Sequence, residues 1–154
     1  MAPSKTMRSR RDVLSLAAAG SATLMFASDH ALATPERVAE EIKKLYGDKK
    51  LTPGKIKLDL PSIAENGLVV PLNFEVESPM TEKDYVKAVH FFAEGNPTIN
   101  VAAFRFTPMT PKAAASVRIR LAKTQDIVAV AEMSSGEIYT ARKEVKVTIG
   151  GCGG

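Results

Sequence analysis

The chain of 154 residues has a single cysteine and no tryptophan. One cysteine excludes a disulfide within the chain, although small exported domains commonly use paired cysteines as cross-links. The thiol is therefore free, reactive or paired with another molecule. We also expect the fold to be held by its hydrophobic core alone, which a domain of about 120 residues can supply.

The N-terminal region also lacks a long hydrophobic run. Its main apolar segment covers residues 13–26, which is too short to span a bilayer as a helix. Basic residues precede this segment and Ala31-Leu32-Ala33 follows it, which is typical of an export signal with its cleavage site. Arg10 and Arg11 form a twin-arginine motif, which directs folded cargo to a bacterial export pathway. The sequence thus predicts a twin-arginine signal peptide over residues 1–33, cleavage after Ala33, a periplasmic location and no membrane anchor.

An excess of either charge is also missing once the signal is removed. Residues 1–33 hold four basic and two acidic residues, so the remaining chain has 17 Lys and Arg against 15 Asp and Glu, a net charge of +2. No run of basic residues alternates with aromatic ones, and the electrostatic pattern of a nucleic-acid-binding protein is therefore absent. We expect no nucleic acid among its partners.

Histidine is equally scarce, since only His90 remains after removal of the signal. A cysteine hydrolase needs a histidine base beside its thiol, and a closed metal site needs more ligands than one cysteine and one histidine. His90 lies in an apolar segment, where we interpret it as an ordinary strand residue. The sequence predicts no metal, no cofactor and no catalytic activity of its own.

The residues that are present predict one helix followed by strands. Thr34 and Pro35 are typical of a helix start, Val38, Ile42 and Leu45 repeat at helical spacing, and a glycine at position 47 ends the segment. From residue 56 onward apolar residues mostly alternate with polar ones. Strands are expected over residues 56–60, 68–76, 85–92, 99–106, 116–121, 127–133, 138–142 and 145–149.

Seven or eight short strands separated by turn residues predict an all-β domain over residues 34–149, an immunoglobulin-like antiparallel β-sandwich with a short N-terminal helix. Pro71 suggests that its strand is at an edge or has a bulge. Residues 86–92 and 127–131 are apolar on both faces, so something must cover the face that points away from the core. The sequence leaves two covers equally open: a second chain, or the N-terminal helix or a neighbouring loop.

The chain ends with Cys152 between two pairs of glycines, Gly150, Gly151, Gly153 and Gly154. Glycine lacks a side chain for packing, so residues 150–154 are expected to be a flexible C-terminal arm. Fully extended, the backbone carries the Cα of Cys152 roughly 10 Å beyond Ile149. A thiol in this position can enter a narrow pocket of another protein.

The twin-arginine signal, the β-rich domain and the terminal sequence VKVTIGGCGG together resemble the SoxY family, the carrier subunits of the bacterial Sox system for thiosulfate oxidation. The resemblance implies that Cys152 covalently holds thiosulfate-derived groups, as an S-thiosulfonate and as a persulfide. It implies a heterodimer with a SoxZ-like β-sandwich subunit. It also implies three partner enzymes: the c-type cytochrome SoxXA, the hydrolase SoxB and the molybdenum-haem dehydrogenase SoxCD.

Two other classes of function stay open. A sulfur carrier or ubiquitin-like modifier that uses a C-terminal diglycine fits Gly153 and Gly154, although such proteins need ATP, which the predicted export would deny them. An exported structural domain cross-linked through Cys152 explains the unpaired cysteine. It does not explain the four glycines beside that cysteine.

Overall fold

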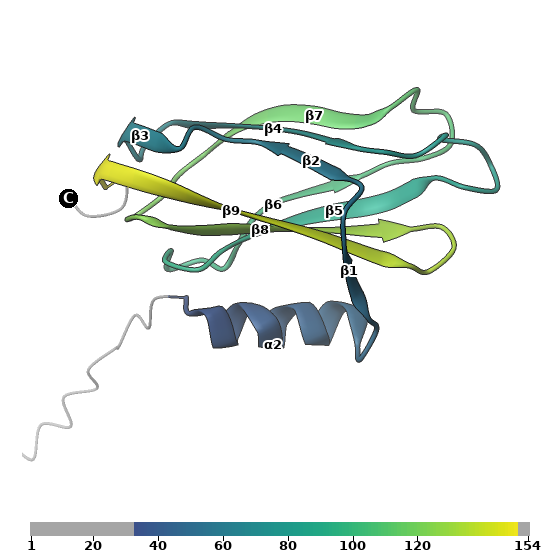
Figure 1. Cartoon of the computed structure of the whole chain (residues 1–154), viewed down its shortest axis with the longest axis horizontal. Coiled ribbons are helices and arrows are strands. Elements are labelled where there is room, and N and C mark those ends of the chain that lie inside the picture. The colour runs from purple at the N-terminus through teal and green to yellow at the C-terminus, as the bar shows by residue number, and fades with distance from the viewer. Residues whose placement is uncertain (1–32, 151–154) are drawn as a thin grey trace, which may run out of the picture.

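The computed structural model describes residues 33–150, which form one helix and nine strands (Figure 1). The large sheet has the strand order β1-β9-β8-β5-β6, with β3 also paired to β9, and the small sheet has the order β2-β4-β7. The elements are α2 (Pro35–Tyr46), β1 (Leu51–Pro53), β2 (Ile56–Asp59), β3 (Ile63–Asn66), β4 (Val70–Val76), β5 (Val86–Ala93), β6 (Asn100–Arg105), β7 (Ala113–Ile119), β8 (Gln125–Met133) and β9 (Ile138–Ile149). The predicted all-β sandwich with a short N-terminal helix is confirmed.

Most strand pairs are antiparallel, as predicted, but two short strands pair in parallel with β9. β1 lies beside the start of β9 and β3 beside its end. The chain leaves the large sheet between them to form β2, and it turns at Gly54, whose φ of +123° is accessible to glycine and unfavourable for other residues. The two runs expected over residues 138–142 and 145–149 form a single continuous strand.

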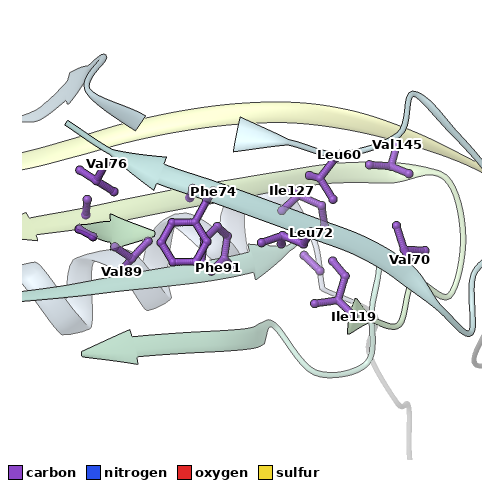
Figure 2. Packing of buried hydrophobic residues seen from close by; sticks show 14 of the residues in the cluster. Leu60, Val70, Leu72, Phe74, Val76, Val89, Phe91, Ile119, Ile127 and Val145 are labelled. Atoms are coloured by element: carbon purple, nitrogen blue, oxygen red, sulfur yellow. The ribbon is translucent and has the colours of Figure 1, made fainter. Parts of the chain in front are cut away.

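The main core fills the space between the two sheets (Figure 2). Phe74 of the small sheet contacts two rings of the large sheet, with centroid distances of 4.8 Å to Phe91 and 5.0 Å to Phe104. Leu72 and Ile127 are fully buried beside them. This core contains no disulfide, so apolar packing supplies the stability of the sandwich.

The helix covers the other face of the large sheet (Figure 1). Its buried residues Val38 and Ile42 pack in a second cluster with Phe92 of β5 and with Val128 and Val130 of β8. These strands are the ones that the sequence showed to be apolar on both faces. The helix is therefore their cover, and that face does not need a second chain.

One residue of the helix stripe differs from the expectation. Leu45 is 47% exposed, and Tyr46 is buried in its place. The helix contacts the sheet along a row of residues spaced four apart: Val38, Ile42 and Tyr46. At the end of this row the Tyr46 ring packs edge-on against His90, with a centroid distance of 6.1 Å. Helical spacing alone did not distinguish the two neighbouring residues.

Pro71 lies in the middle strand of the small sheet and not in an edge strand. However, β2 pairs only with residues 73–76 of β4, so at Pro71 the strand has a neighbour on one side only, Arg118 of β7. The missing N–H of proline therefore removes no bond to β2.

Candidate functional site

The structure describes the region from which the C-terminal segment leaves the domain. Of the residues predicted to carry function, Cys152 and three of its glycines, Gly151, Gly153 and Gly154, lie outside the described residues. Arg10 and Arg11 of the predicted signal do so too. Ala33 and Gly150 lie inside them, and both lie near Asn96: the Ala33 N–H donates to the Asn96 carbonyl, and Gly150 lies against Ala122, whose N–H donates to the Asn96 side chain.

The last residues of β9 are fixed from both sides. On one side β3 pairs with residues 146–149, and the Gly67 N–H extends the ladder by donating to the carbonyl of Ile149 over 2.7 Å. On the other side, where β8 has ended, the Val147 N–H donates to the Thr124 hydroxyl over 3.0 Å. The domain is therefore ordered by hydrogen bonds up to the residue before Gly150.

Gly150 has a steric reason to be glycine. A Cβ atom at this position would collide with the backbone carbonyl of Ala122. A role of Gly150 in a tether remains a prediction, but the close approach makes the residue part of the junction between arm and domain. We call this junction, formed by Ile149, Gly150 and Ala122, the arm root.

The loop that holds Ala122 is itself held by a buried polar pair, Asn96 and Gln125, which are 5% and 7% exposed. The Asn96 amide oxygen accepts from the Ala122 N–H over 2.9 Å and from the Gln125 side-chain amide over 2.8 Å. The Asn96 amide nitrogen donates to the Arg120 carbonyl over 2.8 Å. Since buried polar groups are costly when unpaired, this network fixes the loop beneath the arm root.

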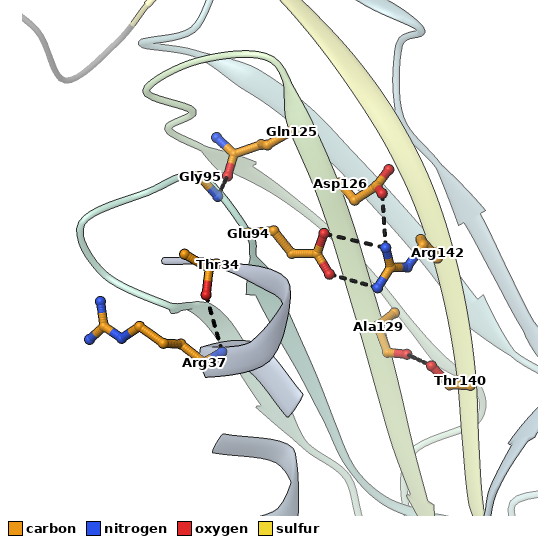
Figure 3. A network of polar contacts seen from close by, with 9 residues as sticks. All are labelled: Thr34, Arg37, Glu94, Gly95, Gln125, Asp126, Ala129, Thr140 and Arg142. Atoms are coloured by element: carbon orange, nitrogen blue, oxygen red, sulfur yellow. Dashed lines mark hydrogen bonds and ion pairs between the residues drawn. The ribbon is translucent and has the colours of Figure 1, made fainter. Parts of the chain in front are cut away.

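The network continues into the end of β5 (Figure 3). The Gly95 N–H donates to the Gln125 side-chain oxygen over 2.7 Å. Residues 95–97 fall between the predicted strands over residues 85–92 and 99–106, and the sequence indicated no role for Gln125. The available signal was a glutamine at the start of an otherwise apolar strand. Its side-chain partner, Asn96, is 29 residues earlier in the sequence, and only the fold brings the two together.

An ion-pair cluster lies beside this network. Arg142 of β9 binds Glu94 through both terminal nitrogens, at 2.6 and 3.3 Å, and Asp126 of β8 at 2.9 Å (Figure 3). Burial raises the pKa of Glu94, and Arg142 opposes that shift. The cluster ties the middle of β9 to the start of β8 and to the residue that follows β5.

Ala33 contacts the same region from the N-terminal side. It is 2% exposed, and its N–H donates to the Asn96 carbonyl over 2.8 Å. The Thr34 hydroxyl caps the helix by accepting from the Arg37 N–H over 3.4 Å (Figure 3). Cleavage after Ala33, which remains a prediction, would remove the first bond and leave the helix cap in place.

His90 lies too far away to assist the thiol. It pairs with Val130, which pairs with Thr140 of β9, so it lies nine strand residues, or about 30 Å, from Ile149. The arm reaches only roughly 10 Å. Burial lowers the pKa of His90, with a further contribution from Arg105, and its ring lies 3.3 Å from the side-chain amide of Asn100. These contacts are those of a strand residue and include no link to the arm root.

Residues 33–150 contain no cluster of three or more histidine, cysteine, aspartate or glutamate side chains arranged for a metal ion. In the same described part of the chain, no helix combines the length and the apolar character needed to cross a membrane.

Comparison with known proteins adds independent evidence. The model of the family described as "Sulfur oxidation protein SoxY" matches residues 42–152. Among solved structures, the sulfur carrier protein SoxY from Chlorobium limicola f thiosulfatophilum is 31% identical, with a TM-score of 0.63, over 74% of this chain and 98% of that one. No curated protein sequence matches.

Other similar structures share the fold alone. A superoxide reductase (neelaredoxin) from Ignicoccus hospitalis is 21% identical, with a TM-score of 0.53, over 75% of this chain and 94% of that one. A putative superoxide reductase from Thermotoga maritima is 13% identical, with the same TM-score, over 69% and 89% of the two chains. At such low identity, a shared sandwich carries no argument about function.

Proposed function

The chain belongs to the SoxY family of sulfur oxidation proteins and is by that membership a sulfur carrier, and we propose that Cys152 is the residue on which the sulfur is carried. The observation that carries the proposal is the match of the family over residues 42–152, which extends to this single cysteine at its last position. The ordered arm root and the glycines around Cys152 support it. Together they give a fixed base and a slender terminus.

The chemistry needs a thiolate and enzymes that the carrier does not itself contain. In the first step, the Cys152 thiolate and thiosulfate form an S–S bond and lose two electrons to the c-type cytochrome SoxXA, which gives the S-thiosulfonate. In the second step, hydrolysis by SoxB consumes one water, releases sulfate and a proton, and leaves a persulfide on Cys152. The dehydrogenase SoxCD then oxidises the outer sulfur to a sulfonate: three waters supply the oxygen atoms, six protons are released and six electrons pass to the haem of that enzyme. The carrier supplies the attachment point, and the one histidine in the described residues, His90, lies too far from the arm to act as a base for the thiol.

We further propose a periplasmic location after export by the twin-arginine pathway, and a heterodimer with a SoxZ-like subunit. The leader sequence with Arg10 and Arg11 supports the location. Family membership supports the partner. The doubly apolar strands no longer support it, because α2 covers them.

The proposal is tested with the mature protein, purified under reductant and incubated with thiosulfate and oxidised SoxXA. Intact-mass measurement should show one thiosulfate-derived group on the wild type and none on Cys152→Ser. A thiocarboxylate at Gly154 would instead indicate the diglycine carrier or modifier. A disulfide dimer as the sole product would indicate the cross-linked structural domain. Either result would overturn the proposal.

A further inference from the structure

A groove lies between the end of β7 and the loop before β6. The end of β7 and the residue after it contribute Arg118 and Arg120, and the loop contributes Pro97 and Thr98. Its volume is about 400 Å³, which is within the range of sites for small ligands. We call it the arginine groove.

The charge of the groove comes from its two arginines. Arg118 and Arg120 are exposed and two residues apart in an extended segment, so their side chains leave the same side of the chain. Within residues 33–150, neither guanidinium takes part in a hydrogen bond or an ion pair. The described residues that line the groove include no acidic side chain, and Glu94, which begins the facing loop, is bound by Arg142 instead. A guanidinium binds oxyanions through two parallel N–H groups, so the arginine groove suits an anion.

The groove also lies within reach of the arm. Gly150 lies against the carbonyl of Ala122, and Arg120 is two residues before Ala122, at most about 7 Å away along the backbone. Cys152 is two residues beyond Gly150, again at most about 7 Å away. A long arginine side chain and a group attached to the thiol can bridge the remaining distance.

One buried side chain joins the groove to the arm root. The Asn96 amide nitrogen donates to the Arg120 carbonyl over 2.8 Å, and the Asn96 amide oxygen accepts from the Ala122 N–H over 2.9 Å. Asn96 also lines the groove. The position of the arginines relative to the base of the arm is therefore fixed by the fold.

We propose that Arg118 and Arg120 bind the sulfonate end of the group carried on Cys152, so that the loaded arm folds back into the arginine groove between its visits to the enzymes. This inference rests on the proposed function, in which the S-thiosulfonate and the product of SoxCD both end in a sulfonate. The short arm holds this anion at an effective concentration in the millimolar range, so a contact that is weak for a free ion is populated. The persulfide lacks sulfonate oxygens, so release of sulfate by SoxB also releases the arm from the groove.

A different role for the two arginines must be separated from this one. β7 is an edge strand of the small sheet, and charged side chains on an edge strand prevent its pairing with other chains. That role needs the charges but no contact with the arm. The test therefore compares a charged and a neutral group on the same thiol.

The experiment loads Cys152 of the ¹⁵N-labelled mature protein chemically, without any partner enzyme. The thiolate attacks the central S–S bond of tetrathionate, which forms the S-thiosulfonate and releases thiosulfate. Methyl methanethiosulfonate places a neutral methyl disulfide on the same sulfur and releases methanesulfinate. Amide chemical shifts are recorded by ¹H–¹⁵N correlation NMR before and after each reaction.

Loading with tetrathionate should shift the amide signals of residues 98–101 and 118–120, whereas the methyl disulfide should leave them in place. Arg118→Gln/Arg120→Gln should reduce these shifts at least about fivefold, and about 0.5 M NaCl should reduce them in the wild type, because salt screens exposed charges. Arg118→Lys/Arg120→Lys should keep part of the response, since lysine keeps the charge and loses the fork.

Lys49→Gln/Lys50→Gln is the matched control. It also removes two exposed positive charges, but Lys49 lies close to Gly136, in the turn that precedes β9 and thus at the opposite end of this strand from Ile149. This variant should respond like the wild type. An equal loss of the shifts in this control would assign them to net charge and overturn the inference.

Three other outcomes would also overturn the inference. Equal shifts with the methyl disulfide would show a contact that needs no sulfonate, and undiminished shifts in the glutamine variant would show a contact that needs no arginine. An absence of shifts in the loaded wild type would leave the arginines as charges of an edge strand. Free thiosulfate at about 1 mM, added to Cys152→Ser, should shift nothing, because a free ion lacks the effective concentration of the tethered one; shifts as large as those of the loaded arm would assign the groove to free anions.

Chemical loading keeps this inference separate from the proposed function. If SoxXA loads Cys152 but the loaded group does not shift the groove, the carrier proposal stands and the arginine groove fails. If the arm loaded with tetrathionate occupies the groove but SoxXA loads nothing, the groove stands and the carrier proposal fails.

Discussion

At the residue scale, the most consequential side chain outside the arm is Asn96. It is buried and holds Ala122, whose carbonyl lies against Gly150. The last described residue of the chain is thus positioned by a side chain more than fifty positions earlier in the sequence. A buried amide with several partners is costly to lose because each partner is left without a bond.

Asn96→Ala should therefore lower the free energy of unfolding by about 2 to 4 kcal/mol. Urea denaturation measures this change. Hydrogen exchange of the backbone amides over residues 121–124 should accelerate at the same time, because the loop loses its anchor. Asn100→Ala is the control, since Asn100 is exposed and its side chain forms one exposed hydrogen bond, to the ring of His90; the variant should cost less than about 0.5 kcal/mol. Equal costs for the two variants would contradict the anchoring role.

His90 gives the protein a pH dependence whose sign follows from its pKa. Burial lowers the pKa of the folded state below the ordinary value of 6.5, and the opposing Glu132 does not reverse the shift. The unfolded chain therefore binds a proton more readily than the folded one as pH falls through 6.5 toward the folded pKa. The stability that neutral His90 contributes to the folded state is fully present above pH 6.5 and is lost as the pH falls from 6.5 through the lowered pKa of the folded state.

Replacing His90 by Gln should flatten this part of the stability profile, which urea denaturation between about pH 7 and pH 5 measures. The groups that face His90 are Tyr46 from α2, Glu132 from β8, and Asn100 and Arg105 from β6. They stay in place in the variant. A slope unchanged by His90→Gln would assign the pH dependence to another group.

At the element scale, α2 covers the face of the large sheet for which the sequence had left a second chain as one of two possible covers. Ile42 is buried against it, whereas Leu45 is half exposed. Replacing either residue by alanine removes three carbon atoms, so the two variants differ mainly in burial. Ile42→Ala should cost about 2 to 4 kcal/mol and Leu45→Ala less than about 1 kcal/mol in urea denaturation. Similar costs would mean that the helix does not pack on the sheet in this orientation.

The elements that the sequence predicted are those with a long periodic signal. The alternation within β4 and β7 and the helical spacing of α2 were sufficient to find these elements. β1 and β3 were missed because neither shows the alternation that revealed β2: all three residues of β1 are exposed and it ends with Pro53, and β3 buries only Ala64. Leu45 was wrongly expected to be buried, because helical spacing shows which side of the helix is apolar but not which of two neighbouring residues on that side contacts the sheet.

At the scale of the whole molecule, the site was predictable only in part. The C-terminal arm was predicted from local sequence, one cysteine among glycines, and from residue 151 onward it stays a prediction because these residues lie outside the described part of the chain. The arm root could not be predicted from the sequence. Its residues and the groups that bond to them come from β3, β9 and the loops after β5 and β7, and only the fold brings these segments together. The cover of the doubly apolar strands was undecided for the same reason.

The same scale separates fold from function. Superoxide reductases share the sandwich at low identity. Within residues 33–150, the present chain has no cluster of side chains of the kind that binds a metal ion. The family match assigns the chain to the sulfur carriers, the role of Cys152 is our proposal, and the shared sandwich by itself carries neither conclusion.

The central claim is that Cys152 is a covalent handle and that its glycines give enzymes access to it. The most direct measurement is the ratio of SoxXA-dependent thiosulfate loading to chemical alkylation, compared among the wild type, Gly151→Val and Gly153→Val, with Cys152→Ser as the unloaded control. The branched side chains should leave alkylation near the wild-type rate and reduce loading at least tenfold, because they restrict the backbone and widen the terminus. Cys152→Ser should support no thiosulfate-dependent turnover. Continued turnover by Cys152→Ser, or an unchanged ratio in both valine variants, would contradict the account.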